Sequence, residues 1–234
     1  MSQIICREVS LGYDGVTVCE HLNFQVNSGD YLCIVGNNGS GKSTLMKALL
    51  GLKEPDSGEI EWGEKARRGS IGYLPQQSEH QRDFPATAIE VVLSGCIGGM
   101  GKAPFYGKHN RSLAKENMKK LGISELSAKP YSSLSGGQQQ RVMLARALCA
   151  AKDIILLDEP VSGLDPASTV EMYELIRRLN RESGMTVIMI THDVDAAIRY
   201  ADSVLYVGEH PEFFPTVADY KQSRVFPAST GGTQ

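Results

Sequence analysis

The chain has 234 residues, of which 41% are hydrophobic, and its 24 basic and 27 acidic residues give a formal net charge of −3. This length is enough for one substantial hydrophobic core, or for a core with a satellite subdomain. The near balance of charge gives no electrostatic argument for binding DNA or RNA, so nucleic acid is not an expected partner.

Nothing in the sequence predicts a signal peptide, a membrane span or a disulfide framework. The first eight residues lack a basic stretch followed by an apolar run. No apolar segment approaches the ~20 residues needed to cross a bilayer, so another chain would have to span any membrane that this protein serves. The five cysteines are scattered, which favours a reducing compartment, and we expect Cys33 and Cys149 to be small buried hydrophobic residues. The five histidines show no ligand spacing with one another or with cysteine, so we expect no structural zinc.

The N-terminal part predicts antiparallel strands. Residues 4–9 and 16–18 flank a turn at Tyr13-Asp14-Gly15, and apolar residues then alternate with polar ones from Leu22 to Val26. The same alternation returns at residues 59–62 and 70–73. We therefore expect the antiparallel part to resume in that second region.

An unbroken apolar run, residues 31–35, leads into a phosphate loop. Residues 36–44 satisfy the pattern G-x-x-x-x-G-K-[ST], and a helix is expected to follow from Lys42 to Leu52. Backbone N–H groups of such a loop curl into an anion nest at a helix N-terminus. Lys42 is expected to reach the β- and γ-phosphates, and the Ser43 hydroxyl to bind Mg²⁺. The loop residues are Gly36, Asn37, Asn38, Gly39, Ser40, Gly41, Lys42, Ser43 and Thr44.

The remainder is first helical and then alternates strand with helix. A mainly helical pattern runs from about residue 86 to residue 151. Apolar strands are predicted at 154–158, 185–191 and 203–207, with an amphipathic helix after the first of them. Such alternation predicts a mostly parallel sheet with helical crossovers.

Two adjacent acids end the first of these strands. Asp158 and Glu159 follow the apolar run 154–157, and Pro160 comes directly after them. Because neighbouring strand residues point to opposite faces, the two carboxylates can take different tasks. We expect Asp158 to support the Mg²⁺ shell.

A five-residue segment, Leu134-Ser135-Gly136-Gly137-Gln138, stands between the phosphate loop and the acids. Ser135 is typical of a helix N-cap, and the two glycines leave the first helical turn open, so this helix N-terminus is a second candidate anion site. With this segment in its place, the chain from Tyr13 to His192 resembles the ATP-binding-cassette (ABC) ATPases, the engines of ABC transporters.

The resemblance assigns further roles to single residues. Glu159 would polarise the attacking water, and His192, in Thr191-His192-Asp193, matches the switch histidine that contacts the γ-phosphate. Gln76 matches the glutamine that touches Mg²⁺ and relays contact with the membrane partner. Tyr13 matches the aromatic residue that stacks on adenine. The residues expected to contact nucleotide are therefore Tyr13, the nine loop residues, Ser135, Gly136, Gly137, Gln138 and, in the loop after the acids, Asp165.

The fold implied is α/β, a P-loop NTPase with a RecA-like core and a mostly parallel sheet, an N-terminal antiparallel β-subdomain and an inserted α-helical signature subdomain. We expect one ABC ATPase domain over residues 1–234. Its antiparallel part would take residues 1–30 and 56–74, its core 31–55 and 152–222, its helical subdomain about 77–151, and a flexible tail 223–234.

Function follows from the same resemblance. Because each nucleotide would need the phosphate loop of one copy and the Ser135 helix of another, we expect a head-to-tail homodimer that closes on ATP and drives separate permease subunits from the cytoplasmic side of the membrane. An extracytoplasmic substrate-binding protein would take part indirectly.

The segment after Gln76, which includes 83–87 and 91–95, resembles the subfamily for zinc, manganese or iron(II) uptake. Importers of iron chelates or cobalamin are the nearest alternative. Non-transport ABC ATPases of DNA repair and translation stay open, although the long heptad insertion of the former and the tandem cassettes of the latter are missing from this sequence.

Overall fold

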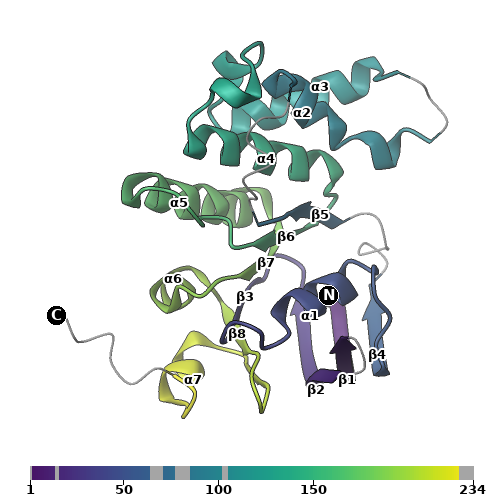
Figure 1. The fold of residues 1–234 in the computed structure, drawn as a ribbon, viewed down its shortest axis with the longest axis vertical. Coiled ribbons are helices and arrows are strands. Elements are labelled where there is room, and N and C mark those ends of the chain that lie inside the picture. Colours follow the sequence, from purple (N-terminus) through teal and green to yellow (C-terminus); the bar gives the residue numbers. More distant parts are fainter. Residues whose placement is uncertain (1, 14–15, 64–70, 77–84, 102–104, 227–234) are drawn as a thin grey trace.

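The computed structural model describes residues 2–13, 16–63, 71–76, 85–101 and 105–226. The remaining residues lie outside this description, among them residues 83 and 84 of the metal-uptake resemblance, residues 227–234 of the predicted tail, and the side chain of Tyr13. The helices, strands and 3₁₀ turns (η) named below keep the labels of Figure 1.

A three-stranded antiparallel sheet forms the N-terminal part, as the alternation predicted. Its order is β2-β1-β4, with β1 (Ser2–Tyr13), β2 (Val16–Asn27) and β4 (Ser57–Trp62). The two strands expected within 16–26 are one continuous strand. Register shifts interrupt its pairing with β1, and His21 adopts a left-handed backbone with φ 52°. These irregularities break the alternation of apolar and polar residues, so the sequence pattern did not show one continuous strand.

The second sheet has six strands in the order β5-β6-β7-β3-β8-β9. All its pairings are parallel except that of β8 with β9. The strands are β3 (Tyr31–Val35), β5 (Ile71–Leu74), β6 (Ile154–Asp158), β7 (Thr186–Ile190), β8 (Ser203–Tyr206) and β9 (Glu212–Phe214).

One expected placement is wrong. We expected residues 70–73 in the antiparallel part, but β5 pairs in parallel with β6, with Ile71 opposite Ile154 and Leu74 opposite Leu157. Period-2 alternation reveals which face of a strand is buried, but it does not reveal which strand lies beside it.

The six-stranded sheet, called the central sheet below, separates two hydrophobic cores. Along β3, Tyr31, Cys33 and Val35 face one core, whereas Leu32 and Ile34 face the other. Strands β6 and β7 alternate in the same way. A parallel strand buried on both faces needs apolar residues at every position, which explains the unbroken run that precedes the phosphate loop.

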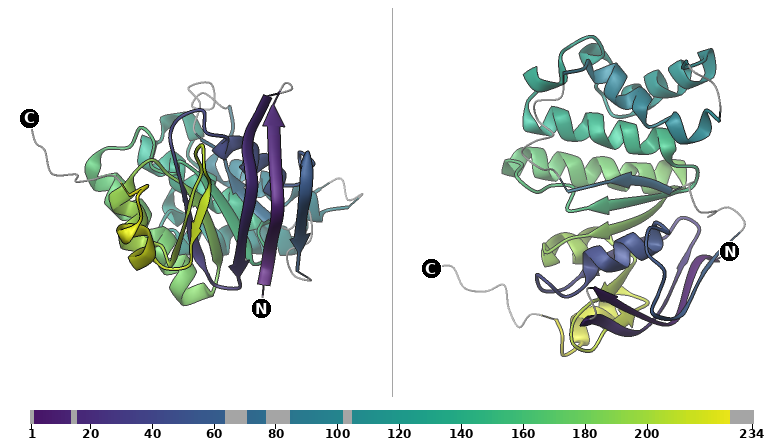
Figure 2. Two further views of the ribbon diagram at one scale, coloured as in Figure 1. Left: turned by 90° about the horizontal axis from the view of Figure 1, so that it is seen from below. Right: turned by 45° about the vertical axis from the view of Figure 1, so that its right-hand side comes forward.

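Helix α1 (Lys42–Leu49) lies between the two sheets (Figures 1 and 2), and its Leu45, Met46 and Leu49 pack in one core with residues of both. The opposite face of the central sheet is covered by α5 (Pro166–Ser183) and α6 (Val194–Tyr200). The described part of the C-terminus adds α7 (Val217–Gln222) beside β8 and β9.

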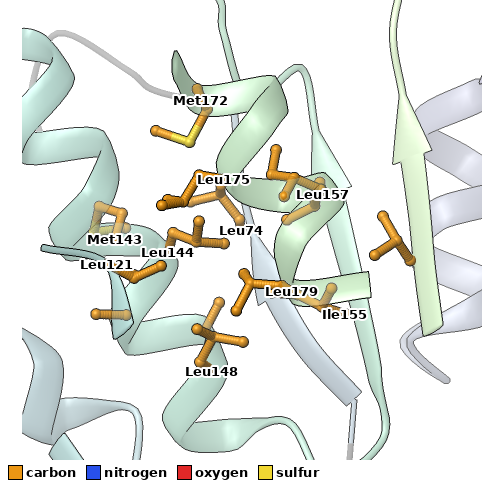
Figure 3. Close-up of a cluster of buried hydrophobic side chains, with 14 of the residues drawn as sticks. Leu74, Leu121, Met143, Leu144, Leu148, Ile155, Leu157, Met172, Leu175 and Leu179 are labelled. Carbon is orange, nitrogen blue, oxygen red and sulfur yellow. The ribbon is translucent and has the colours of Figure 1, made fainter. Parts of the chain in front are cut away.

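Three helices lie beyond α5 and form the helical part: α2 (Ala88–Ser94), α3 (Lys108–Lys120) and α4 (Gly136–Ala150). The 3₁₀ turns η2 (Ile97–Gly99), η3 (Ser124–Leu126) and η4 (Tyr131–Ser133) connect them. Figure 3 shows how α4 joins this part to the sheet, because Met143, Leu144 and Leu148 meet side chains of β5, β6 and α5 in one continuous core.

The predicted tail begins later than expected. Val225 and Phe226 pack against the main core, and the ring of Phe226 meets that of Tyr220 edge-on at a centroid distance of 5.3 Å. Residues 223–226 are therefore part of the folded body. This packing could not be expected from the sequence, because two adjacent hydrophobic residues in a polar stretch form no periodic pattern.

Candidate nucleotide site

A cleft of about 670 Å³ opens where β3 and β6 end and α1 begins. It gathers residues that are far apart in the sequence, from the phosphate loop, from the segment after β5, from the end of β6 and from the turn after β7. Its lining is Val18, Asn38, Gly39, Gly41, Lys42, Ser43, Thr44, Gln76, Asp158, Glu159, Ile190 and His192.

The phosphate loop has positive φ at three glycines, Gly36, Gly39 and Gly41, and a side chain at the first or the last would also meet close neighbours. Gly41 is the N-cap of α1 with φ 98°, and a Cβ there would lie 3.1 Å from the carbonyl oxygen of Val18. Gly36 has φ 152°, and a Cβ there would overlap the carbonyl oxygen of Val207. The loop therefore turns sharply onto the helix, and the first N–H groups of α1 lack helical partners and face the cleft.

Lys42 is the cation of the cleft. The residue is 7% exposed, and its Nζ donates to the carbonyl oxygens of Gly36 at 2.8 Å and Asn37 at 2.7 Å. Burial lowers the pKa of the ammonium group, while the charges of Glu159 and Asp158 act in the opposite direction. The loop thus holds a buried positive charge on its own carbonyls, ready to interact with an anion in the cleft.

The two acids at the end of β6, Asp158 and Glu159, have different surroundings. Burial, with a smaller contribution from the charge of Glu159, raises the pKa of Asp158. The carboxylate also accepts a hydrogen bond from the Tyr73 hydroxyl at 3.4 Å. Glu159 also lines the cleft, and it has a left-handed backbone with φ 47°, which is uncommon for a residue other than glycine. Backbone strain at a non-glycine residue in a cleft is typical of a functional position.

Two side chains meet the Glu159 carboxylate. The Nε2 of Gln76 donates to its Oε2 at 2.9 Å, and the Nδ1 of His192 lies 3.4 Å from its Oε1. His192 is open to solvent with a side chain that is 68% exposed, whereas the Glu159 side chain is 16% exposed. The structure thus brings Gln76, Glu159 and His192 together.

Sequence reasoning missed Val18 and Ile190, which line the cleft, and Tyr73, which contacts a cleft residue without lining the cleft itself. Tyr73 bonds to Asp158, and burial raises the pKa of its phenol to about 12, so the hydroxyl remains a donor at neutral pH. Val18 lines the cleft from β2 and touches the position of Gly41. All three lie on strands, where the sequence pattern had explained them as structural residues, and no local motif marks any of them.

The remaining predicted residues lie outside this cleft. Gly36 and Asn37 border a neighbouring cavity of about 440 Å³, which also contains Asn38 and His192. Ser40 lies within the loop but lines neither cavity. The backbone of Tyr13 ends β1, and its side chain is outside the described part of the chain.

The signature segment forms a second, separate group. Ser135 caps α4 by accepting from the Gln138 N–H at 3.3 Å, and the Gln138 side chain accepts from the Ser135 N–H at 3.1 Å, which completes a capping box. A Cβ at Gly137 would lie 3.1 Å from the Ser168 hydroxyl, and this hydroxyl donates to Asp165. This open helix N-terminus and Asp165 therefore adjoin each other, but neither lines the phosphate-loop cleft.

A family model described as "ABC transporter" matches residues 19–162, which include the phosphate loop, the signature segment and both acids. The chain belongs to the ABC transporter family. Its predicted α/β cassette fold is confirmed, and the family and its ATPase relatives establish ATP binding and ATP hydrolysis as its activity.

Several characterised proteins are similar over most of their length. The manganese transport system ATP-binding protein MntB of Bacillus subtilis is 40% identical over 84% of this chain and 80% of the relative. The zinc transport system ATP-binding protein AdcC of Streptococcus pneumoniae is 36% identical over 88% and 90%. The achromobactin transport ATP-binding protein CbrD of Dickeya dadantii is 32% identical over 91% and 81%.

Solved structures agree in fold. A metal-chelate type ABC transporter in an inward-facing conformation superposes with a TM-score of 0.84 at 30% identity, over 94% of this chain and 85% of the other. The dimer of the cassette MJ0796 bound to ADP and Pi gives a TM-score of 0.73 at 29% identity, over 90% and 98%.

The described residues contain neither a candidate membrane span nor a cluster of His, Cys, Asp and Glu suited to a metal ion. No helix among them is long and apolar enough to cross a membrane. Within the same residues, no three His, Cys, Asp or Glu side chains are grouped so that they could hold a metal ion.

Proposed function

We propose that this chain is the ATP-hydrolysing subunit of an importer for a divalent transition-metal ion, with zinc or manganese as the favoured cargo. The similarity to manganese and zinc transport ATPases at 36–40% identity is the observation that carries this proposal. The chain spans at least 80% of each of these two relatives, so the comparison concerns whole proteins.

Uptake of an iron chelate, or of a related chelate such as cobalamin, is the second candidate. It is supported by the achromobactin relative at 32% identity and by the structural likeness to a metal-chelate type transporter. The nucleotide cleft does not distinguish the two candidates, because the cargo does not enter it.

The first step is nucleotide binding in the cleft. The N–H groups at the start of α1 and the Lys42 ammonium would bind the phosphates, and Lys42 would exchange the carbonyls of Gly36 and Asn37 for phosphate oxygens. Tyr13 is proposed to stack on adenine, at the end of the strand β1 that pairs with the cleft-lining strand β2.

The donor set of the cleft suits Mg²⁺. Ser43, Gln76 and Asp158 all line it and offer a hydroxyl, an amide and a carboxylate oxygen, the ligand type that this ion prefers. We propose that these three residues hold the ion, which when bound would neutralise phosphate charge. The hydrogen bond from Tyr73 would fix the orientation of the Asp158 carboxylate.

Glu159 is proposed as the residue that activates water. Its carboxylate accepts from Gln76 and adjoins His192, so both would help to orient it as a base. His192, with its exposed ring, would also reach the γ-phosphate. Gln76 would connect these events to the surface where the permease docks.

The separation of the two half-sites supports a head-to-tail homodimer. The capped N-terminus of α4 is open but does not face the phosphate loop of its own chain. A second copy would supply Ser135, Gly136, Gly137, Gln138 and Asp165 to the bound nucleotide. The dimeric form of the MJ0796 cassette with ADP and Pi supports this arrangement. Closure on ATP and opening after hydrolysis would then drive the permease.

The protein is proposed to act at the cytoplasmic face of a membrane, attached to separate permease subunits. An extracytoplasmic substrate-binding protein would take part indirectly. The names of the transport-system relatives support this assignment. The balanced charge supports the expectation that nucleic acid is not a partner.

The test is co-purification of the tagged chain from native membranes, followed by ATPase assays of the complex with candidate binding proteins. Stimulation by a zinc- or manganese-loaded binding protein is expected, whereas stimulation only by a ferric-chelate-loaded protein would favour the second candidate. Recovery of nucleic acid or ribosomes without a membrane protein would contradict a role in transport.

A matched variant tests the mechanism. Glu159→Gln keeps the size and the hydrogen bond from Gln76 but removes the base, so turnover is expected to fall by about 10²-fold or more while ATP binding persists. The variant should accumulate as an ATP-dependent dimer in size-exclusion chromatography. Normal turnover would contradict the role of Glu159.

A further inference from the structure

A buried tyrosine connects helix α5 to the turn that carries His192. Tyr173 is 3% exposed, and its hydroxyl donates to Asp193 Oδ2 at 3.3 Å. The side chain of Thr191 contacts the same hydroxyl. Tyr173 thus contacts the residues immediately before and after His192, although it does not line the nucleotide cleft.

The turn itself is tightly hydrogen-bonded on both sides of His192. The Thr191 N–H donates to Ile34 of β3 at 3.1 Å, and the Asp193 N–H donates to the Thr191 hydroxyl at 3.0 Å. Asp193 divides its carboxylate between two tasks, because Oδ1 caps α6 by accepting from Ala196 at 2.9 Å while Oδ2 accepts from Tyr173. Loss of the tyrosine hydroxyl would therefore leave one oxygen of the cap without its partner.

The ring of Tyr173 is held in place independently of its hydroxyl. It stacks on the ring of Tyr200 at a centroid distance of 5.3 Å, and the guanidinium groups of Arg177 and Arg199 lie over Tyr200 at 5.8 and 5.5 Å. Burial raises the pKa of the Tyr173 phenol well above its usual value, so the hydroxyl stays protonated and acts as a donor. A fixed ring with a permanent donor is suited to orienting a neighbouring turn.

We propose that Tyr173 is a positioning residue for ATP hydrolysis, whose hydroxyl orients the turn from Thr191 to Asp193 so that His192 meets Glu159. The inference rests on the role proposed above for His192. It goes beyond that role because part of the control of the switch histidine would then come from α5, the helix whose N-cap is Asp165, beside the signature segment.

The expected effect is on turnover and not on ATP binding. Lys42 and the phosphate loop do not contact Tyr173, so the KM for ATP should change by less than about twofold. Loss of one hydrogen bond of ordinary net strength corresponds to a fall in kcat of about three- to tenfold.

The test compares Tyr173→Phe with Tyr200→Phe in the full chain, under conditions in which the unchanged protein hydrolyses ATP. Both substitutions remove one hydroxyl from the same ring stack, but the Tyr200 hydroxyl donates to Glu174 at 3.0 Å and does not reach the His192 turn. We expect the fall in kcat for Tyr173→Phe alone, with KM nearly unchanged and thermal unfolding midpoints of the two variants within about 2 °C of each other.

His192→Ala, measured in the same series, distinguishes a failure of the inference about Tyr173 from a failure of the role proposed for His192. If His192→Ala lowers kcat but Tyr173→Phe does not, the inference about Tyr173 is overturned and the proposed function stands. An equal fall for Tyr173→Phe and Tyr200→Phe would also overturn it, since a general effect of the ring stack would then explain both. Full turnover by His192→Ala would remove the proposed role of His192 and the inference with it.

Discussion

Helix α2 packs tightly against α4 at Gly95, the C-cap of α2, and this contact allows a sharp test of the packing in the helical part. A Cβ at Gly95 would overlap the carbonyl oxygen of Arg146, 2.9 Å from its carbon, and would lie 3.1 Å from Cys149 Cβ. The backbone of Gly95 has φ −65°, which alanine adopts without strain, so the substitution Gly95→Ala tests contact alone.

The cost follows from the depth of this overlap. A Cβ at Gly95 would lie 2.0 Å from the carbonyl oxygen of Arg146, and carbon and oxygen atoms come no closer than about 3.3 Å, so α2 would have to move from α4 by roughly 1 Å or more. Overpacking of this kind costs about 1–3 kcal/mol, and a loss of about 2 kcal/mol lowers the unfolding midpoint of a chain of this size by about 4–8 °C. Gly98→Ala is the matched control because a Cβ there meets nothing within 4 Å.

The assay is thermal unfolding followed by circular dichroism, with urea unfolding for the free energy. We expect Gly95→Ala to be destabilised by the amount above and Gly98→Ala to remain within about 1 kcal/mol of the unchanged protein. Equal midpoints for the two variants would refute the close helix crossing, since slack between α2 and α4 would have to exist.

Two further predictions concern the site. Ser135→Ala and Thr87→Ala each remove the N-cap side chain of a capping box, the first on α4 and the second on α2, and each should lower the free energy of unfolding in urea by about 1 kcal/mol. Only Ser135→Ala should abolish ATP turnover, and equal activities of the two variants would contradict the role of Ser135. The raised pKa of Asp158 means that the folded protein keeps this proton to higher pH than the unfolded chain, so its ionisation weakens folding as pH rises above the ordinary value near 3.8. Asp158→Asn should therefore have a higher free energy of unfolding than the unchanged protein at pH 7 in Mg²⁺-free buffer, and this gain should vanish towards pH 4. A gain that does not depend on pH would contradict the raised pKa of Asp158.

Much of the fold could be predicted from the sequence because its signals are local. The phosphate loop needs glycine at positions with positive φ, and the run 31–35 is apolar throughout because β3 is buried on both faces. The capping box of α4 needs only the four consecutive residues from Ser135 to Gln138. The partner of β5 could not be predicted, since alternation is equally compatible with an antiparallel and a parallel neighbour.

The candidate site divides in the same way. By itself the sequence determined which residues can bind phosphate, cap a helix or ionise at a strand end, because these properties depend on neighbouring residues along the chain. Only the tertiary structure decided that Gln76 meets Glu159, that Tyr73 meets Asp158 and that Tyr173 holds the turn around His192. In the first two contacts the partners are separated by 83 and by 85 positions in the sequence. All three contacts depend on how strands and helices pack, and no pattern of adjacent residues predicts that packing.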